Sequence, residues 1–280
     1  MGSSTDADGQ ERGQGLGEAD ARRLKLAHGL LQHPSLTAKI ANLLGRPIEY
    51  GLDLLPGKAS GIVATATRKA IHASLKVALM TLRTAGQDEE PPSNVWHKIG
   101  AAATGGVGGF FGLAAVTLEL PVTTTIIMRS IADIARSEGA DLDDREIQLE
   151  CVQVLALGGK SDKDDAADVG YFATREAMAK AAADAALFLA KGGKVAGTSA
   201  PALLRLINLV AQRFGITVTE KIAVQAVPVI GAAAGAVINT AFMDHYQDMA
   251  RGHFIMLGLE RKYGREVVRA EYDRLSRKRR

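Results

Sequence analysis

Apolar residues recur at helical spacing along most of the chain, and no stretch shows the sustained alternation of apolar and polar residues that is typical of a half-exposed strand. The pattern therefore predicts an all-α protein of about seven to ten helices. A further segment, punctuated by Pro47 and Pro56, is interpreted as broken helix. The expected helices cover residues 21–32, 36–44, 58–83, 122–137, 143–157, 161–191, 201–214 and 244–280.

Two long segments carry no charge at all. Residues 99–118 and 222–243 are 20 and 22 residues long, and both contain glycines four residues apart, a spacing that lets helix backbones approach closely. Their length suffices to cross a hydrocarbon core of about 30 Å. Their abundant Gly and Ala, however, provide little hydrophobic free energy for insertion. We expect two closely packed central helices in a single-domain bundle, with insertion into a bilayer as the alternative.

Local signals mark where several helices begin and end. Pro121 suits the first position of the helix over 122–137. Asp143 and Glu146 have the spacing of a capping box for the next helix, and Gly158 with Gly159 follows its expected end.

Composition supports one globular domain flanked by short tails. Of the 280 residues, 47% are hydrophobic and 23% charged, which is typical of a chain with a sizeable core. Cys151 is the single cysteine, so no internal disulfide can form, and we interpret it as a small buried apolar residue. The N-terminus lacks the pattern of a secretory signal. We expect a disordered tail over 1–19, a helical domain over 20–275 and a basic tail over 276–280.

Positive charge gathers at the two ends of the expected domain. Residues 251–280 carry ten Lys and Arg against four acids, a net charge of +6 in a chain whose total is +3. Such a basic end favours an anionic partner such as lipid headgroups, although a solvated helix end is also compatible with it. The basic helix over 21–32 either lies on a membrane or docks on its own domain. The candidate membrane contacts are Arg22, Arg23, Lys25, Phe110, Phe111, Arg274, Arg277, Lys278, Arg279 and Arg280.

No motif in the sequence defines a reaction. The segment LGGKSD resembles a phosphate loop, but Val154 stands where that loop needs its first glycine. The six histidines do not have the spacing of metal ligands, so we predict neither a metal nor a cofactor.

Six polar residues are candidate ligand-binding groups, each with a structural alternative. Glu119 lies among apolar neighbours and needs a partner there. His253 and Glu260 are about 10 Å apart along one helix face, too far to touch directly but able to line one groove. Arg129 and Asp133 have the spacing of an ordinary surface pair. The full set is Glu119, Arg129, Asp133, Asn239, His253 and Glu260.

The chain also resembles a known family. WHKIGAAATGGVGGFFG, LELPVTTTIIMRSIADIARSEG, VLALGG and VPVIGAAAGAVINTAFMDHYQDMARGHFIMLGLERKYG are similar to the EcsC protein family, over about residues 24–275. That family is mostly bacterial and is named after a gene beside an ABC-transporter pair, which implies an envelope or transport context. The resemblance supplies no catalytic residues. The positions that lie in its motifs are Glu119, Pro121, Arg129, Asp133, Asn239, His253, Phe254, Glu260 and Gly264.

We therefore expect a non-enzymatic, cytoplasmic protein that binds anionic lipid or another hydrophobic ligand at the inner face of the membrane, through its basic ends and its Gly/Ala-rich helices. One alternative is a hydrolase-like enzyme acting on a lipid or peptide, which requires Glu119, Arg129, Asn239 and His253 to converge in one closed pocket. Another is an adaptor for an ABC transporter, which predicts an exposed apolar patch and no cavity. Nucleic acid is not an expected partner, because few aromatic residues accompany the basic ones.

Overall fold

The computed structural model describes residues 15–32, 59–81, 113–158, 167–193, 200–225 and 231–277. Within these ranges the chain forms eight α-helices and no strand, which confirms the predicted all-α, single-domain fold. The expected helix over 36–44 and the broken helix after it lie outside the described residues. The helices are α1 (Glu18–Leu31), α4 (Ala59–Thr81), α6 (Leu113–Ser137), α7 (Arg145–Leu157), α8 (Ala167–Ala190), α9 (Pro201–Gln225), α10 (Gly231–Tyr263) and α11 (Arg265–Arg277).

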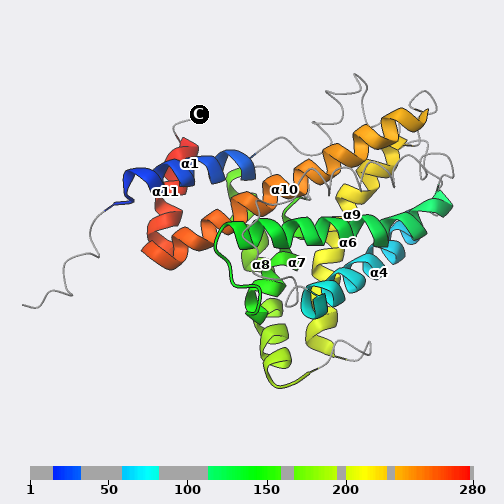
Figure 1. Cartoon of the computed structure of the whole chain (residues 1–280), viewed down its shortest axis with the longest axis horizontal. Coiled ribbons are helices and arrows are strands. Elements are labelled where there is room, and N and C mark those ends of the chain that lie inside the picture. Colours follow the sequence, from blue (N-terminus) through cyan, green and yellow to red (C-terminus); the bar gives the residue numbers. More distant parts are fainter. Residues whose placement is uncertain are drawn as a thin grey trace, which may run out of the picture.

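The long helix α10 runs the length of the molecule and contacts helices on several sides (Figure 1). Along one part it packs on α6, which in turn packs on α4. Helices α7, α8 and α9 pack against one another and form a second group. This group contacts the first through α9 and α7, both of which touch α4 and α10. At the opposite end from α4, the first and last helices, α1 and α11, lie against each other and against α10.

Aromatic side chains fill the centre of the main core. Phe214 on α9 and Phe242 with Tyr246 on α10 are completely buried and form three ring contacts with centroids 5.2 to 6.0 Å apart. Burial of each such side chain from water stabilises the fold by about 1.5–3 kcal/mol. Cys151 on α7 is also completely buried, as predicted.

Helix α1 docks on its own domain, which confirms one of the two expected roles for this segment. Leu24 and Ala27 are buried at the contact with α10. The two helices approach closely because Gly252 has no side chain: a Cβ there would lie 2.7 Å from Cγ of Leu31. On the α11 side, His28 Nε2 and the hydroxyl of Ser276 are 2.9 Å apart in a hydrogen bond.

The first uncharged segment leads into a helix that begins earlier than predicted. Helix α6 starts at Leu113 and continues through Pro121, so Pro121 is an interior residue and not the helix start. A proline at this position removes one backbone hydrogen bond. Packing of α6 on α4 and α10 keeps the helix continuous despite that loss. Residues 99–112, with the glycines of the first segment, lie outside the described residues.

The second uncharged segment is divided between two helices, contrary to the single helix expected. Its first four residues end α9, and the part from Gly231 onward begins α10, with 226–230 outside the described residues. Helix α9 is longer than predicted because it continues through Gly215, whose helix-interior cost of about 1 kcal/mol is offset by packing on α4, α7 and α8. Helices α6 and α10, each of which includes a described part of one uncharged segment, do pack on each other.

Three further boundaries differ from the sequence-based prediction. The C-terminal helix is interrupted at Gly264, whose φ of +86° is a conformation that suits glycine, so α10 and α11 are separate helices. Helix α1 begins at Glu18, inside the tail expected to be disordered. The cap of α7 is Asp144 and not Asp143: its side chain accepts a hydrogen bond from the backbone N–H of Glu146.

None of the described helices combines the length and the apolar character that a membrane crossing requires. Residues 99–112 and 226–230 of the two uncharged segments lie outside the described residues.

Candidate functional site

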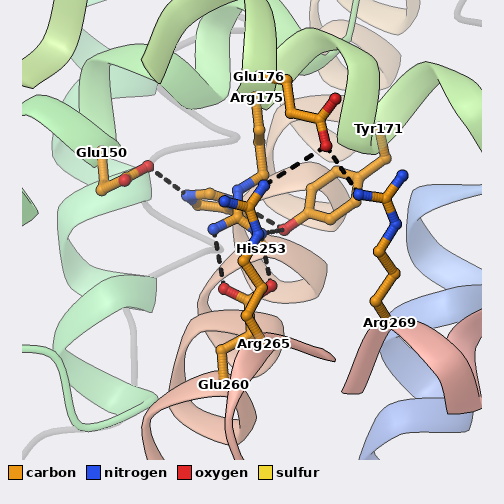
Figure 2. A network of polar contacts seen from close by, with 8 residues as sticks. All are labelled: Glu150, Tyr171, Arg175, Glu176, His253, Glu260, Arg265 and Arg269. Atoms are coloured by element: carbon orange, nitrogen blue, oxygen red, sulfur yellow. Dashed lines mark hydrogen bonds and ion pairs between the residues drawn. The ribbon is translucent and has the colours of Figure 1, made fainter. Parts of the chain in front are cut away.

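A network of buried polar groups links α7, α8 and α10 (Figure 2). At its centre is His253 of α10, which is completely buried. Its Nε2 lies 2.9 Å from Oε2 of Glu150 on α7, and its Nδ1 lies 3.1 Å from the hydroxyl of Tyr171 on α8. Both ring nitrogens therefore have a partner, and the imidazole is fixed in orientation.

The hydrogen bonds of this network can be arranged in a series in which each group donates to the next. Arg175 donates from Nη1 to the hydroxyl oxygen of Tyr171 over 3.3 Å. Burial raises the pKa of the Tyr171 hydroxyl, so it keeps its proton and can donate that proton to Nδ1 of His253. The Nε2–H of His253 then donates to Glu150. With this order of donors, the proton of a neutral imidazole is on Nε2 and faces the carboxylate of Glu150.

Arg175 connects the two ends of the network. Its Nη1 and Nη2 donate to the two carboxylate oxygens of Glu260 over 2.7 and 2.9 Å, a bidentate ion pair. Both side chains are about nine-tenths buried, with 12% and 10% exposed. The guanidinium also lies over the ring of Tyr171, with Cζ 5.4 Å from the centroid. Loss of either charge would leave the other buried without its partner.

Glu150 is more exposed to solvent than His253, Tyr171, Arg175 and Glu260. Its side chain is 24% exposed, whereas that of His253 is not exposed at all. Burial would raise the pKa of the Glu150 carboxyl, but the hydrogen bond from His253, together with the electrostatic effects of His253 and then Arg175, outweighs burial and lowers that pKa. Glu150 is thus a fixed carboxylate, ionised at neutral pH, in the wall of a pocket of about 240 Å³ between α7 and α8.

The structure brings His253 and Glu260 into this one network, but side chains of the protein itself occupy the space between them. The sequence placed the two residues on one helix face with a groove between them, and the side chains of Tyr171 and Arg175 fill that space. Glu150, Tyr171 and Arg175 were not recognised from the sequence. The sequence feature that could have indicated these residues is Arg175 itself. It is a lone arginine in an Ala-rich helix, where a charged side chain needs a partner.

Glu119 and Asn239 lie together in a second buried polar cluster. Nζ of Lys221 on α9 donates to Oε1 of Glu119 on α6 over 2.8 Å, and both side chains are at least nine-tenths buried. Nδ2 of Asn239 on α10 donates to the same oxygen over 3.4 Å. Burial lowers the pKa of the Lys221 ammonium, although the negative charge of Glu119 and its hydrogen bond with Lys221 act to raise that pKa. The partner expected for Glu119 is therefore a lysine, which the sequence analysis did not identify.

Arg129 and Asp133 lie outside both clusters, on the outer part of α6. Arg129 is exposed, and Asp133 is paired with Arg136 over 3.5 Å. The four residues that a hydrolase-like pocket would require therefore do not converge: Glu119 and Asn239 share one cluster, His253 belongs to another, and Arg129 is at the surface.

The candidate membrane contacts on α1 and α11 lie at one end of the molecule (Figure 1). Arg22, Arg23 and Lys25 are exposed on α1, as are Arg274 and Arg277 on α11. Arg23 and Arg274 form ion pairs, over 2.8 Å each, with Glu138 and Glu271 respectively. The remaining candidates, Phe110, Phe111, Lys278, Arg279 and Arg280, lie outside the described residues.

Across the ranges that the structure describes, no three His, Cys, Asp or Glu side chains come together as metal ligands would.

The fold and its buried polar groups define an all-α protein in which a histidine, a tyrosine and two buried ion pairs connect the helices. A family model for the EcsC protein family matches residues 28–256, most of the chain, and the protein belongs to this family. No curated protein and no solved structure matches the chain.

Proposed function

We propose that this protein acts by binding and not by catalysis, and that it attaches to the anionic face of a membrane through the end of the molecule formed by α1 and α11. The observation that carries the proposal is the outer face of α1. This helix docks on α10 through one side, and its other side presents Arg22, Lys25 and Leu26 to solvent. Leu26 is 50% exposed, beside two cations.

This arrangement suits a helix lying flat on lipid headgroups. Cations near an anionic surface each contribute about 1 kcal/mol to binding, and an adjacent leucine adds apolar contact with the acyl boundary. Lys25, Arg261 and Arg277 form no ion pair within the described part of the chain. Arg22 has only a loose, exposed pair with Glu18 at 3.7 Å. Their charge therefore remains available to an external anion.

The basic tail of residues 278–280 follows α11 directly in the sequence and carries three further cations. A peripheral protein at the inner face of the membrane is the localisation that this charge distribution supports. A connection with transport or envelope processes would follow from the family context. The adaptor alternative would use the same end of the molecule for a protein partner.

The test is flotation of the purified full-length chain with vesicles of phosphatidylglycerol and phosphatidylcholine. We expect binding only where phosphatidylglycerol is present. The double variant Arg22→Glu/Lys25→Glu should weaken that binding by about tenfold or more. Neither side chain is buried, so the fold should be retained.

A matched control places the same charge change elsewhere. Lys69 and Lys76 are exposed on α4, at the far end of the molecule from α1 (Figure 1). Lys69→Glu/Lys76→Glu should leave vesicle binding nearly unchanged. Equal losses in the two double variants would mean that net charge alone controls binding and would contradict the assignment to α1 and α11. Equal binding to both lipids would contradict the electrostatic basis of the proposal.

A further inference from the structure

The pocket beside Glu150 has a charged part and an apolar wall. It lies between α7 and α8 and has a volume of about 240 Å³, below the range of about 300–1,000 Å³ that is typical of drug-sized ligands. Leu149, Glu150 and Gln153 line it from α7, and Arg175 lines it from α8. Any ligand that fits must therefore be small.

Four alanines create the space in this pocket. Ala179, Ala182, Ala183 and Ala186 recur at helical spacing on the side of α8 that lines it. Larger side chains at these positions would fill the gap between α7 and α8. The wall opposite α7 is thus smooth and apolar, and suits a short hydrocarbon chain.

The charge facing the pocket is negative after ion pairs are taken into account. Glu146 and Glu150 lie one helical turn apart on α7, and Glu146 is exposed without an ion pair among the described residues. Arg175 is neutralised by its bidentate contact with Glu260. At the mouth, Arg265 lies 3.7 Å from Glu176, which also pairs with Arg269 over 2.7 Å. Arg265 is therefore only partly neutralised, and the two carboxylates of α7 outnumber it.

The position of Glu150 is fixed by its hydrogen bond to a buried residue. Its Oε2 accepts a hydrogen bond from the buried His253, which Tyr171 holds from the other side (Figure 2). A carboxylate oriented in this way loses little conformational freedom when a cation binds to it, which favours binding.

We propose that this pocket binds a small primary ammonium compound, with the ammonium group at Glu150 and a short alkyl chain along the alanines of α8. Glu146 stabilises the same positive charge from the pocket mouth. The inference is separate from membrane attachment, because it concerns a different surface of the molecule and a soluble ligand.

The test is titration of the full-length chain with n-pentylammonium chloride, followed by isothermal calorimetry and by protein NMR. Sodium pentanoate serves as the probe of opposite charge. We expect saturable binding of pentylammonium at a single site and binding at least tenfold weaker for pentanoate. Equal affinity for the two probes, or no saturable binding of pentylammonium, would overturn the proposal.

Three variants locate the site. Glu150→Gln should weaken pentylammonium binding at least tenfold, and Glu146→Gln, at an exposed position that the fold does not need, should weaken it severalfold. Ala182→Leu should block binding by filling the pocket without any change in charge. Glu271→Gln removes a carboxylate on α11 outside the pocket lining and should have no effect. Unchanged binding in Ala182→Leu would assign the ammonium to surface charge and overturn the proposal.

Discussion

Lys221 and Glu119 form a buried ion pair that joins the ends of the two uncharged segments, with Nζ and Oε1 2.8 Å apart. Glu119 directly follows the first segment, and Lys221 directly precedes the second. Nζ of Lys221 also lies 5.1 Å from the ring centroid of Phe242, which is part of the central aromatic core. The pair thus connects α6 and α9 at the two residues that border the uncharged segments.

We predict that removal of one partner of this pair is costly. Glu119→Leu or Lys221→Met leaves a charge buried without its counter-ion, so the free energy of unfolding should fall by about 3–5 kcal/mol. Guanidinium denaturation of the purified variants measures this change.

The double variant Glu119→Leu/Lys221→Met provides the control. Since neither charge remains, it should recover most of the stability lost in the single variants. Losses that simply add in the double variant would show that the two side chains do not depend on each other.

Acid stability should depend on Glu150. Its carboxyl has a pKa below the ordinary value in the folded protein, so it contributes stability above pH of about 4.5 and loses that contribution as the pH falls further. Glu150→Gln should therefore reduce the difference in unfolding free energy between pH 7 and acid. Part of the acid loss should persist, because hydrogen bonds from Lys262 and Tyr263 lower the pKa of Asp20 as well. A pH profile identical to that of the native sequence would contradict this role.

The docking of α1 should respond to a single methyl group at Gly252. A Cβ there would lie 2.7 Å from Cγ of Leu31 and 3.3 Å from the backbone oxygen of Ala27, so Gly252→Ala forces α1 away from α10. We expect a loss of about 1–3 kcal/mol and faster amide hydrogen exchange in α1.

Gly258 is a matched control on the same helix, because a Cβ at that position meets nothing within 4 Å. Gly258→Ala should be neutral or stabilising by up to about 1 kcal/mol. Similar losses in both variants would mean that α1 is not packed closely at Gly252.

The C-terminal tail can be tested apart from the helix that carries it. Deletion of 278–280 removes three cations and should weaken binding to anionic vesicles by about fivefold per charge, with no change in stability. Deletion of 274–280 also removes Ser276, whose hydroxyl bonds to His28 and Gln32 of α1, so this longer deletion should lower the melting temperature too. Unchanged vesicle affinity after either deletion would contradict a role for the tail in binding.

The sequence was informative where structure depends on neighbouring residues. Helical periodicity predicted the fold class, and the burial of Cys151 was predicted from its small, apolar character. It was less informative where distant packing decides the outcome. Pro121 lies inside α6, and Gly215 inside α9, because tertiary contacts outweigh the local preferences of these residues.

The candidate site shows the same division. His253 and Glu260 were found because they share one helix face. Their partners come from other helices: Arg175 is 85 residues from Glu260, and Lys221 is 102 residues from Glu119. Charges so far apart in sequence have many possible partners, and only the packing of the helices selects one.

Fractionation of the native protein tests its proposed attachment to a membrane most directly. Cells that produce it at its natural level are broken at low salt, and the membranes are washed in turn with high salt, with carbonate and with detergent. If the basic end formed by α1 and α11 holds the protein to anionic lipid, it should sediment with the membranes and be released by high salt. Release only by detergent would place the uncharged segments in the bilayer, and recovery entirely in the soluble fraction at low salt would contradict membrane attachment itself.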